Sequence, residues 1–311
     1  MTALDEVAAY LPDRRVPIED LADQLALSPS QLKVLRRFHG LSEVRRQEPG
    51  ETVFDLLAGA AVRLSRLPGR EHAVRHLIYA RGVPVATPYP DNPVHDLKDS
   101  LGLANADAFT VTHHGCATTL LAVDLAGRLL ATAGEPDALA LVVTGEQVFT
   151  YDTAVAPDSR VFGEGAGACL VSARGSRDRM LSYVARQRGD LDHWLPNNVD
   201  LAERYAAEYP ELLDEVVQAA VKRAGLGLDD IALILPHNVN TVSWKRLCKR
   251  LELPVERVYL DNVPVTGHTF AADAFLNYRS AVDAGLLREG DRYVIAAAGF
   301  GAIFSAMVLQ H

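Results

Sequence analysis

Cysteine is scarce in this sequence of 311 residues, and its few occurrences exclude two common structural roles. Cys116, Cys169 and Cys248 are an odd number, and no two of them stand in a CxxC spacing. A disulfide framework and a structural zinc site are therefore not indicated. Each thiol has to be judged by its own neighbours.

The sequence also lacks a long apolar run, a basic amino terminus and an excess of positive charge. No unbroken apolar stretch approaches the ~20 residues that cross a bilayer. The opening MTALDEVAAYLPDRR has acidic residues where a secretory signal carries positive charge, so we expect a cytoplasmic protein without a membrane partner. A formal net charge of -9 argues against nucleic-acid binding, because a phosphate backbone attracts a basic surface.

The remaining composition, 49% hydrophobic and 23% charged residues, is that of an ordinary globular protein. Apolar strands such as DAFTVTH, ALALVVTG, DIALILPHN and RVYLD alternate with helical segments along the whole chain. This pattern predicts an α/β fold with a sheet covered by helices on both faces. Its repetition predicts two duplicated halves, residues 1–175, which contain Cys116, and residues 176–311, which contain His237 and His268.

Cys116 stands at a corner between a predicted strand and a predicted helix, in the sequence TVTHHGCATTLLAVD. The first turn of a helix has unpaired N–H groups and a partial positive charge, and both stabilise a thiolate. Ligands of α/β folds also bind at the carboxyl ends of strands. The alternative is an inert buried thiol, which is the commonest fate of a free cysteine.

Two histidines occupy similar corners. His237 ends the apolar strand LILPHNVN, and His268 follows the turn YLDNVPVTGH at the start of a predicted helix. An imidazole can hold a thiolate in an ion pair or polarise a carbonyl. Near the carboxyl terminus, the GFG segment offers backbone N–H groups of the kind that form an oxyanion hole. Together these features predict a buried nucleophile with two imidazoles.

In their order and spacing, these motifs resemble the thiolase superfamily, most closely its β-ketoacyl-acyl-carrier-protein synthase III group. The segment 162–168, FGEGAGA, is similar to FGDGAGA of that group; 236–240, PHNVN, is similar to PHQAN; and 267–272, GHTFAA, is similar to GNTSAA. The resemblance covers nearly the whole chain. It implies an α/β thiolase fold of five layers, α-β-α-β-α, made of two duplicated halves, and a homodimer.

The resemblance implies an acyltransferase in which Cys116 takes an acyl group from a thioester and passes it to a second substrate. His237 would polarise a malonyl thioester carbonyl as carbon dioxide leaves. The N–H groups of Cys116 and Gly301 would hold the thioester oxyanion, and Asn240 of the PHNVN motif would contact substrate. No metal or redox cofactor is implied.

His268 is the first departure from the synthase III pattern, which has asparagine at this position. An imidazole Nε2–H can donate to an enolate oxygen as an amide can, so decarboxylative condensation remains open. A neutral His268 could instead deprotonate an alcohol or amine, and the product would then be an ester or amide. A histidine that merely packs at a helix start is the third alternative. The sequence does not choose between donor and general base.

The second departure concerns the acyl donor. Synthase III enzymes that use acyl-CoA stack its adenine between a tryptophan and an arginine, whose positions fall here at Leu32 and near Ser42. We therefore expect a donor on the phosphopantetheine arm of an acidic acyl carrier protein, rather than CoA. Positive charge would steer that partner to the helix after His237. The predicted docking residues are Lys245, Arg246, Lys249 and Arg250.

Two further residues are predicted to bind substrate. Side chains alternate along a strand, so one of His113 and His114 points inward, and His114 would shape the acyl pocket or pack in the core. By the resemblance, Tyr89 in TPYPDN stands where many relatives place an aromatic residue of the partner chain that closes the acyl pocket. A hydroxyl there argues against a simple long alkyl chain.

The favoured function is decarboxylative condensation of the acyl group with a malonyl-type, carrier-bound thioester in specialised polyketide or fatty-acid-like biosynthesis. The alternatives are an acyltransferase that forms an ester or amide, a non-catalytic ketosynthase-like partner protein, and a thioester hydrolase. Retention of Cys116 and His237 weighs against the non-catalytic alternative.

Overall fold

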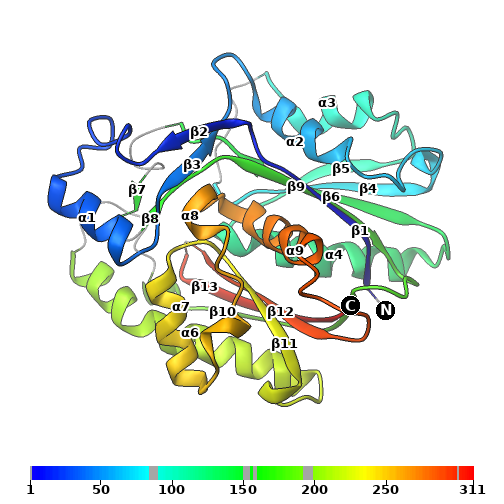
Figure 1. The fold of residues 1–311 in the computed structure, drawn as a ribbon. Helices are drawn as coiled ribbons and strands as arrows, with labels where there is room; N and C mark the ends of the chain where they lie inside the picture. The colour runs from blue at the N-terminus through cyan, green and yellow to red at the C-terminus, as the bar shows by residue number, and fades with distance from the viewer. Residues whose placement is uncertain (1, 84–89, 150–154, 157–159, 192–198, 300) are drawn as a thin grey trace.

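The computed structural model describes residues 2–83, 90–149, 155–156, 160–191, 199–299 and 301–311. Strands and helices alternate through both halves of the chain, as the apolar pattern predicts. The first and last strands bring the two termini close together (Figure 1).

A mixed sheet of nine strands runs through both halves of the described chain. From one edge to the other its strands are β11 (Ile231–Pro236), β12 (Arg292–Gly299), β13 (Ile303–Gln310), β10 (Arg179–Gln187), β1 (Ala3–Tyr10), β9 (Gly165–Ser172), β6 (Leu139–Glu146), β4 (Val74–Ala80) and β5 (Asp107–Val111). The two halves of the sheet meet between β1 and β10, where Ala3 opposite Arg179 is the one register pair. The sheet therefore consists of two smaller sheets, one on each side of the contact between β1 and β10, which is short.

Helices cover these two sheets on both sides, which gives five layers (Figure 1). The outer helices of the first half are α2 (Val53–Ala61) and α3 (Pro93–Ser100), and those of the second half are α6 (Val199–Arg223) and α7 (Thr241–Leu251). The middle layer consists of α4 (Thr118–Ala133) and α9 (Asp273–Asp283). The predicted α-β-α-β-α order is confirmed.

Alternate residues of one strand explain why the layers hold together. In β6, Leu141 and Val143 pack under the outer helices, whereas Val142 faces the middle layer. In β12, Ile295 faces the same middle layer and Val294 faces the helices of the second half. Strands that are buried on both faces need an almost continuous apolar sequence, and this is the pattern that the strands have.

One predicted strand, RVYLD at 257–261, is wrong. Its first residue, Arg257, ends a 3-10 turn that starts at Val255, and a single bridge between Val258 and Ile234 is all that forms. The chain then turns into α8 (Val263–Thr266). The predicted boundary at residue 175 falls between the end of β9 and the start of β10, and the division into halves stays a prediction.

One helical segment, Gly115–Ala133, has the length and composition to cross a membrane. Its 18-residue window is 61% buried inside the protein, because the helix lies in the middle layer between the two sheets. A helix that packs on several sides is expected to be apolar around most of its circumference.

A smaller lobe extends the first half away from the main sheet. It contains α1 (Pro29–Arg37) and the two-stranded pair of β2 (Arg14–Pro17) and β3 (Glu43–Arg46). A short strand pair of β7 (Val155–Ala156) and β8 (Arg160–Val161) leads into the glycine-rich turn before β9. This turn continues into the strand β9, so it offers no helix terminus for a phosphate.

Candidate active site

Cys116 lies in a 3-10 turn, Gly115–Ala117, which leads directly into α4. The Thr118 hydroxyl donates to the carbonyl of Gly115 at 2.7 Å and ties the turn to the helix. Gly299 at the end of β12 backs onto the same turn. A Cβ added to Gly299 would lie 2.3 Å from the His114 oxygen and 2.8 Å from the Cys116 nitrogen. Only glycine fits there, and Cys116 itself is 5% exposed.

His268 faces the thiol of Cys116. Its Nε2 lies 2.9 Å from Sγ of Cys116, and its Nδ1 lies 2.5 Å from Oδ2 of Asp273. The main chain of His268 is held in place by Val161 and Gly163, because His268 N donates to Val161 O and Gly163 N donates to His268 O, each at 3.0 Å. The three side chains therefore form a chain of cysteine, histidine and aspartate.

Asp273, the first residue of α9, is a residue that the sequence analysis missed. Its Oδ1 accepts from the N–H of Thr269 at 2.8 Å and from the hydroxyl of Thr269 at 2.6 Å. Its Oδ2 accepts from the N–H of Asn238 at 2.6 Å as well as from His268. A carboxylate with these donors is a fixed acceptor, so it holds the proton of His268 on Nδ1 and directs Nε2 at the sulfur.

The electrostatics of His268 depend on its two partners. Burial alone would lower its pKa, but the negative charges of Cys116 and Asp273 outweigh this effect and raise the pKa to about 9. His268 is therefore protonated at neutral pH. A protonated imidazole at 2.9 Å from a thiol is the arrangement that stabilises a thiolate.

His237 lies beside His268, with ring centroids 5.8 Å apart. Its Nε2 is 2.9 Å from the hydroxyl of Tyr209 on α6, and its carbonyl accepts from the indole N–H of Trp244 at 2.9 Å. Burial and then the charge of His268 keep the pKa of His237 well below its usual value, so this ring is neutral. The contact with Tyr209 was not predicted from the sequence.

The other predicted site residues lie at different distances from this centre. The side chain of Asn240 caps α7, because its Oδ1 accepts from the N–H of Ser243 at 2.8 Å. His114 is half-buried directly before the cysteine turn, and burial lowers its pKa. Gly301 has φ 80°, and a Cβ added to it would meet only Ile303 within 4 Å. Tyr89 lies outside the described residues.

The predicted docking residues form an exposed basic face on α7. The set consists of Lys245, Arg246, Lys249 and Arg250. Arg250 also pairs with Asp214 of α6, with 3.4 Å between Nε and Oδ2. The start of α7 touches the segment after α1, since the N–H of Thr241 donates to the carbonyl of His39 at 3.0 Å. The last turn of α1, which contains Arg36 and Arg37, therefore lies near the start of α7.

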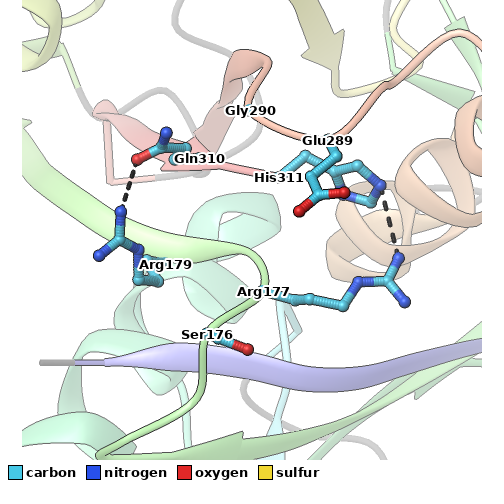
Figure 2. A pocket seen from close by; sticks show the side chains of 7 residues that line it. All are labelled: Ser176, Arg177, Arg179, Glu289, Gly290, Gln310 and His311. Carbon is cyan, nitrogen blue, oxygen red and sulfur yellow. Dashed lines mark hydrogen bonds between the residues drawn. The ribbon is translucent and has the colours of Figure 1, made fainter.

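A separate cavity of about 510 Å³ lies at the start of β10 and the end of β13 (Figure 2). Arg179 donates to Gln310 at 2.8 Å there, and Arg177 lies 3.4 Å from His311. His311 is in turn held by the buried carboxylate of Asp178, which also accepts from two tyrosine hydroxyls. This cavity contains none of the predicted site residues, and its contacts fix the carboxyl-terminal strand.

Known proteins resemble the chain in both sequence and structure. A family model described as 3-oxoacyl-[acyl-carrier-protein] synthase III, C terminal, matches residues 221–311. The β-ketoacyl-[acyl-carrier-protein] synthase III of Sphingopyxis alaskensis is 29% identical in an alignment that is 333 residues long with its gaps. This alignment covers 99% of this chain and 98% of that protein.

Two solved structures extend this comparison. The synthase III of Thermus thermophilus superposes with a TM-score of 0.83 at 25% identity and covers 99% of both chains. A structure named as the acyltransferase ChlB3 superposes with a TM-score of 0.86 at 21% identity, over 99% of this chain and 97% of that one. The similarity therefore extends over both halves of the molecule.

Proposed function

We infer that the chain belongs to the β-ketoacyl-acyl-carrier-protein synthase III-like acyltransferases of the thiolase superfamily, whose fold it has. From this premise we propose that it carries an acyl group on Cys116 and transfers it to the hydroxyl or amino group of a second substrate. The product is an ester or amide. The observation that carries this proposal is the aspartate behind the active-site histidine.

Asp273 favours the general-base role among the two roles that the sequence left open for His268. A carboxylate that accepts from Nδ1–H makes Nε2 the basic nitrogen once the extra proton has left, and a base is what an alcohol or amine needs. Decarboxylative condensation instead needs Nε2–H donors directed at the thioester carbonyl. The Nε2 of His237 is already hydrogen-bonded to Tyr209, which leaves this ring poorly placed for that task.

In the first half of the reaction, the Cys116 thiolate attacks the carbonyl carbon of the donor thioester. The carbon–sulfur bond to pantetheine breaks, and His268 gives its Nε2 proton to the departing thiolate. Cys116 is now a neutral thioester, so the largest charge that raised the pKa of His268 is gone. The pKa of His268 falls, and the ring becomes an available base.

In the second half, Nε2 of His268 takes the proton of the acceptor as its oxygen or nitrogen attacks the acyl carbon. The bond from that carbon to Sγ of Cys116 breaks and restores the thiolate beside a protonated imidazole. In both halves the oxyanion is held by the N–H of Cys116 and an N–H of the GFG segment. The sequence assigns this second donor to Gly301, whereas the close approach of Gly299 to the turn favours Gly299.

The donor is proposed to arrive on a phosphopantetheine arm of an acyl carrier protein. The exposed basic face of α7, with Lys245 and Lys249 on adjacent turns, supports docking of an acidic partner. Three buried free cysteines in the described chain suit a reducing compartment, and we propose a cytoplasmic enzyme that works as a homodimer.

Condensation is the second candidate function. The presence of a second imidazole, His237, at 5.8 Å from His268 favours it, because two imidazoles can share the carbonyl of a malonyl thioester. A product of this reaction in specialised polyketide or fatty-acid-like biosynthesis is the corresponding proposal. The two candidates differ in one measurable product, carbon dioxide.

The experiment begins with enzyme that is acylated by an acetyl-pantetheine thioester and checked by intact mass. One portion then receives a malonyl thioester on a carrier protein, and another receives a panel of small alcohols and amines. Loss of the acyl adduct with formation of an ester or amide, without carbon dioxide release, is the expected result. Adduct loss only with the malonyl thioester, together with carbon dioxide, would establish condensation instead.

A further inference from the structure

Arg160 places a permanent positive charge next to the proposed active site. It belongs to β8, and its Cζ lies 5.4 Å from the ring centroid of Phe162. The Phe162 ring in turn lies 4.9 Å from the ring of His268 and 4.4 Å from that of Phe270. One aromatic ring therefore connects the guanidinium with the imidazole, and Arg160 is only half-buried.

The charge of Arg160 acts on the groups around the thiol. After burial and the charge of His268, it is the next cause that lowers the pKa of His237. It also opposes the effect of burial on Tyr205, whose pKa is nevertheless raised to about 12, and on Tyr209. Both tyrosines respond to the charge of Cys116 as well. Arg160 and the thiol thus act on the same two side chains.

Nothing in the reaction scheme uses this cation. The oxyanion is held by backbone N–H groups, and His268 moves the proton. Yet a planar guanidinium is the side chain best suited to a carboxylate, because two parallel N–H donors match its two oxygens. Arg160 is half-buried beside the ring of Phe162, which is 1% exposed, so such a pair would be screened by water only in part.

We propose that Arg160 binds the carboxylate of the acceptor, so that the second substrate is a short hydroxy acid or amino acid. The carboxylate pairs with the guanidinium over Phe162, and the hydroxyl or amino group reaches Nε2 of His268. This inference rests on the proposed transfer to an oxygen or nitrogen nucleophile. It adds the chemical class of that nucleophile.

The test uses matched acceptors with and without a carboxylate. Enzyme that carries an acetyl group on Cys116 is mixed with 3-hydroxybutyrate or 2-butanol, and with β-alanine or propylamine, and loss of the adduct is followed by intact mass. The unmodified protein is expected to prefer the acid of each pair by at least about ten-fold in kcat/KM, as a charged hydrogen-bonded pair allows.

Arg160→Gln should remove this preference through a higher KM for the acids and leave the neutral acceptors and the acylation step unchanged. Arg63→Gln is the matched control, because Arg63 also stacks on a ring, that of Tyr10 at 4.6 Å, outside the site. An equal loss with acids and neutral acceptors would mean that Arg160 only supports Phe162. A loss confined to acylation by carboxylate-bearing donors would assign Arg160 to the donor instead. Either result overturns the proposal.

A binding measurement keeps the inference separate from the proposed function. Calorimetric titration of Cys116→Ala protein with 3-hydroxybutyrate needs no acyl transfer. Binding that weakens at least about ten-fold when Arg160→Gln is added supports the carboxylate site even if the transfer reaction fails. Equal binding to both proteins overturns it even if transfer to alcohols succeeds.

Discussion

His268 and Asp273 are joined through Nδ1 and Oδ2 at 2.5 Å, on the side of the imidazole ring that faces away from Cys116. This pair determines the chemistry that we propose, because the carboxylate fixes which nitrogen carries a proton. Asp273→Asn should therefore slow deacylation by an alcohol or amine about 10² to 10⁴-fold. This is the range expected when the imidazole of a general base is held in the wrong tautomer. The rate is measured by intact mass on enzyme that has already been acylated.

A second variant controls for loss of a carboxylate as such. Asp124→Asn removes a carboxylate that pairs with Arg128 on α4, outside the site. It should leave deacylation unchanged. If Asp273→Asn protein remains folded and deacylates at the normal rate, the aspartate has no part in proton transfer and condensation becomes the better candidate.

The pH dependence of Cys116 alkylation tests the ion pair. The pKa of His268 in the folded protein is raised to about 9, compared with about 6.5 in the unfolded chain. The folded protein therefore keeps this proton up to a higher pH. The stabilising charge of the imidazolium is thus fully present below pH 6.5 and is lost as the pH rises through 9.

Iodoacetamide should accordingly alkylate Cys116 of the unmodified protein rapidly at pH 7. The His268→Gln variant has no imidazolium, so its rate at pH 7 should be at least about ten-fold lower and should rise steadily toward pH 9, as for an ordinary thiol. Cys116→Ala protein measures any background from the other cysteines. Identical pH profiles for the two proteins would show that His268 does not activate the thiol.

The sequence predicts this centre only in part, and the reason is physical. Cys116, His237 and His268 each follow an apolar strand, and a pattern of strand, turn and polar residue can be read locally. Asp273 and Tyr209 give no such signal, because their partners are set by how a turn folds back and by how α6 packs. Tertiary contacts, and not the local sequence, determine which carboxylate or hydroxyl lies next to an imidazole.

The fold was more predictable than the site because layers depend on apolar periodicity. Even so, RVYLD has the residues of a strand and forms only one bridge, because a 3-10 turn ends at Arg257 just before Val258 and the chain then turns into α8. The glycines of GFG are a similar case. Sequence alone favoured Gly301, and only the approach of β12 to the cysteine turn distinguishes Gly299 from it.

Gly299→Ala and Gly301→Ala test how strongly the geometry of the cysteine turn depends on each glycine. A methyl group on Gly299 would press on two backbone atoms of the thiol turn and displace the Cys116 N–H from the oxyanion. We expect acylation by an acetyl-pantetheine thioester to fall at least about 10²-fold, as when one oxyanion donor is lost. Gly301→Ala meets strain from its positive φ of 80° but no such contact, so a much smaller loss is expected.

Thermal unfolding of both glycine variants separates a loss of activity from a loss of structure. The reverse order of effects, with Gly301→Ala inactive and Gly299→Ala active, would show that the oxyanion site depends on the backbone conformation at Gly301 and not on the packing of Gly299 against the cysteine turn.

Charge reversal on α7 tests the carrier-protein surface. Lys245 and Lys249 are exposed and one turn apart. Arg250 is left unchanged because it is already paired with Asp214. The double variant Lys245→Glu, Lys249→Glu should lower kcat/KM for a carrier-bound donor at least about ten-fold and weaken its dependence on salt, because steering by opposite charge is lost. The same variant should use a small pantetheine thioester normally.

The matched control reverses a basic pair elsewhere on the same half of the molecule. Lys222 and Arg223 are exposed at the end of α6, so Lys222→Glu, Arg223→Glu changes the net charge by the same amount. If both double variants lose activity equally with the carrier-bound donor, net charge rather than docking on α7 is responsible. If the α7 variant also loses activity with the small thioester, these lysines act on the catalytic centre and not on the carrier protein.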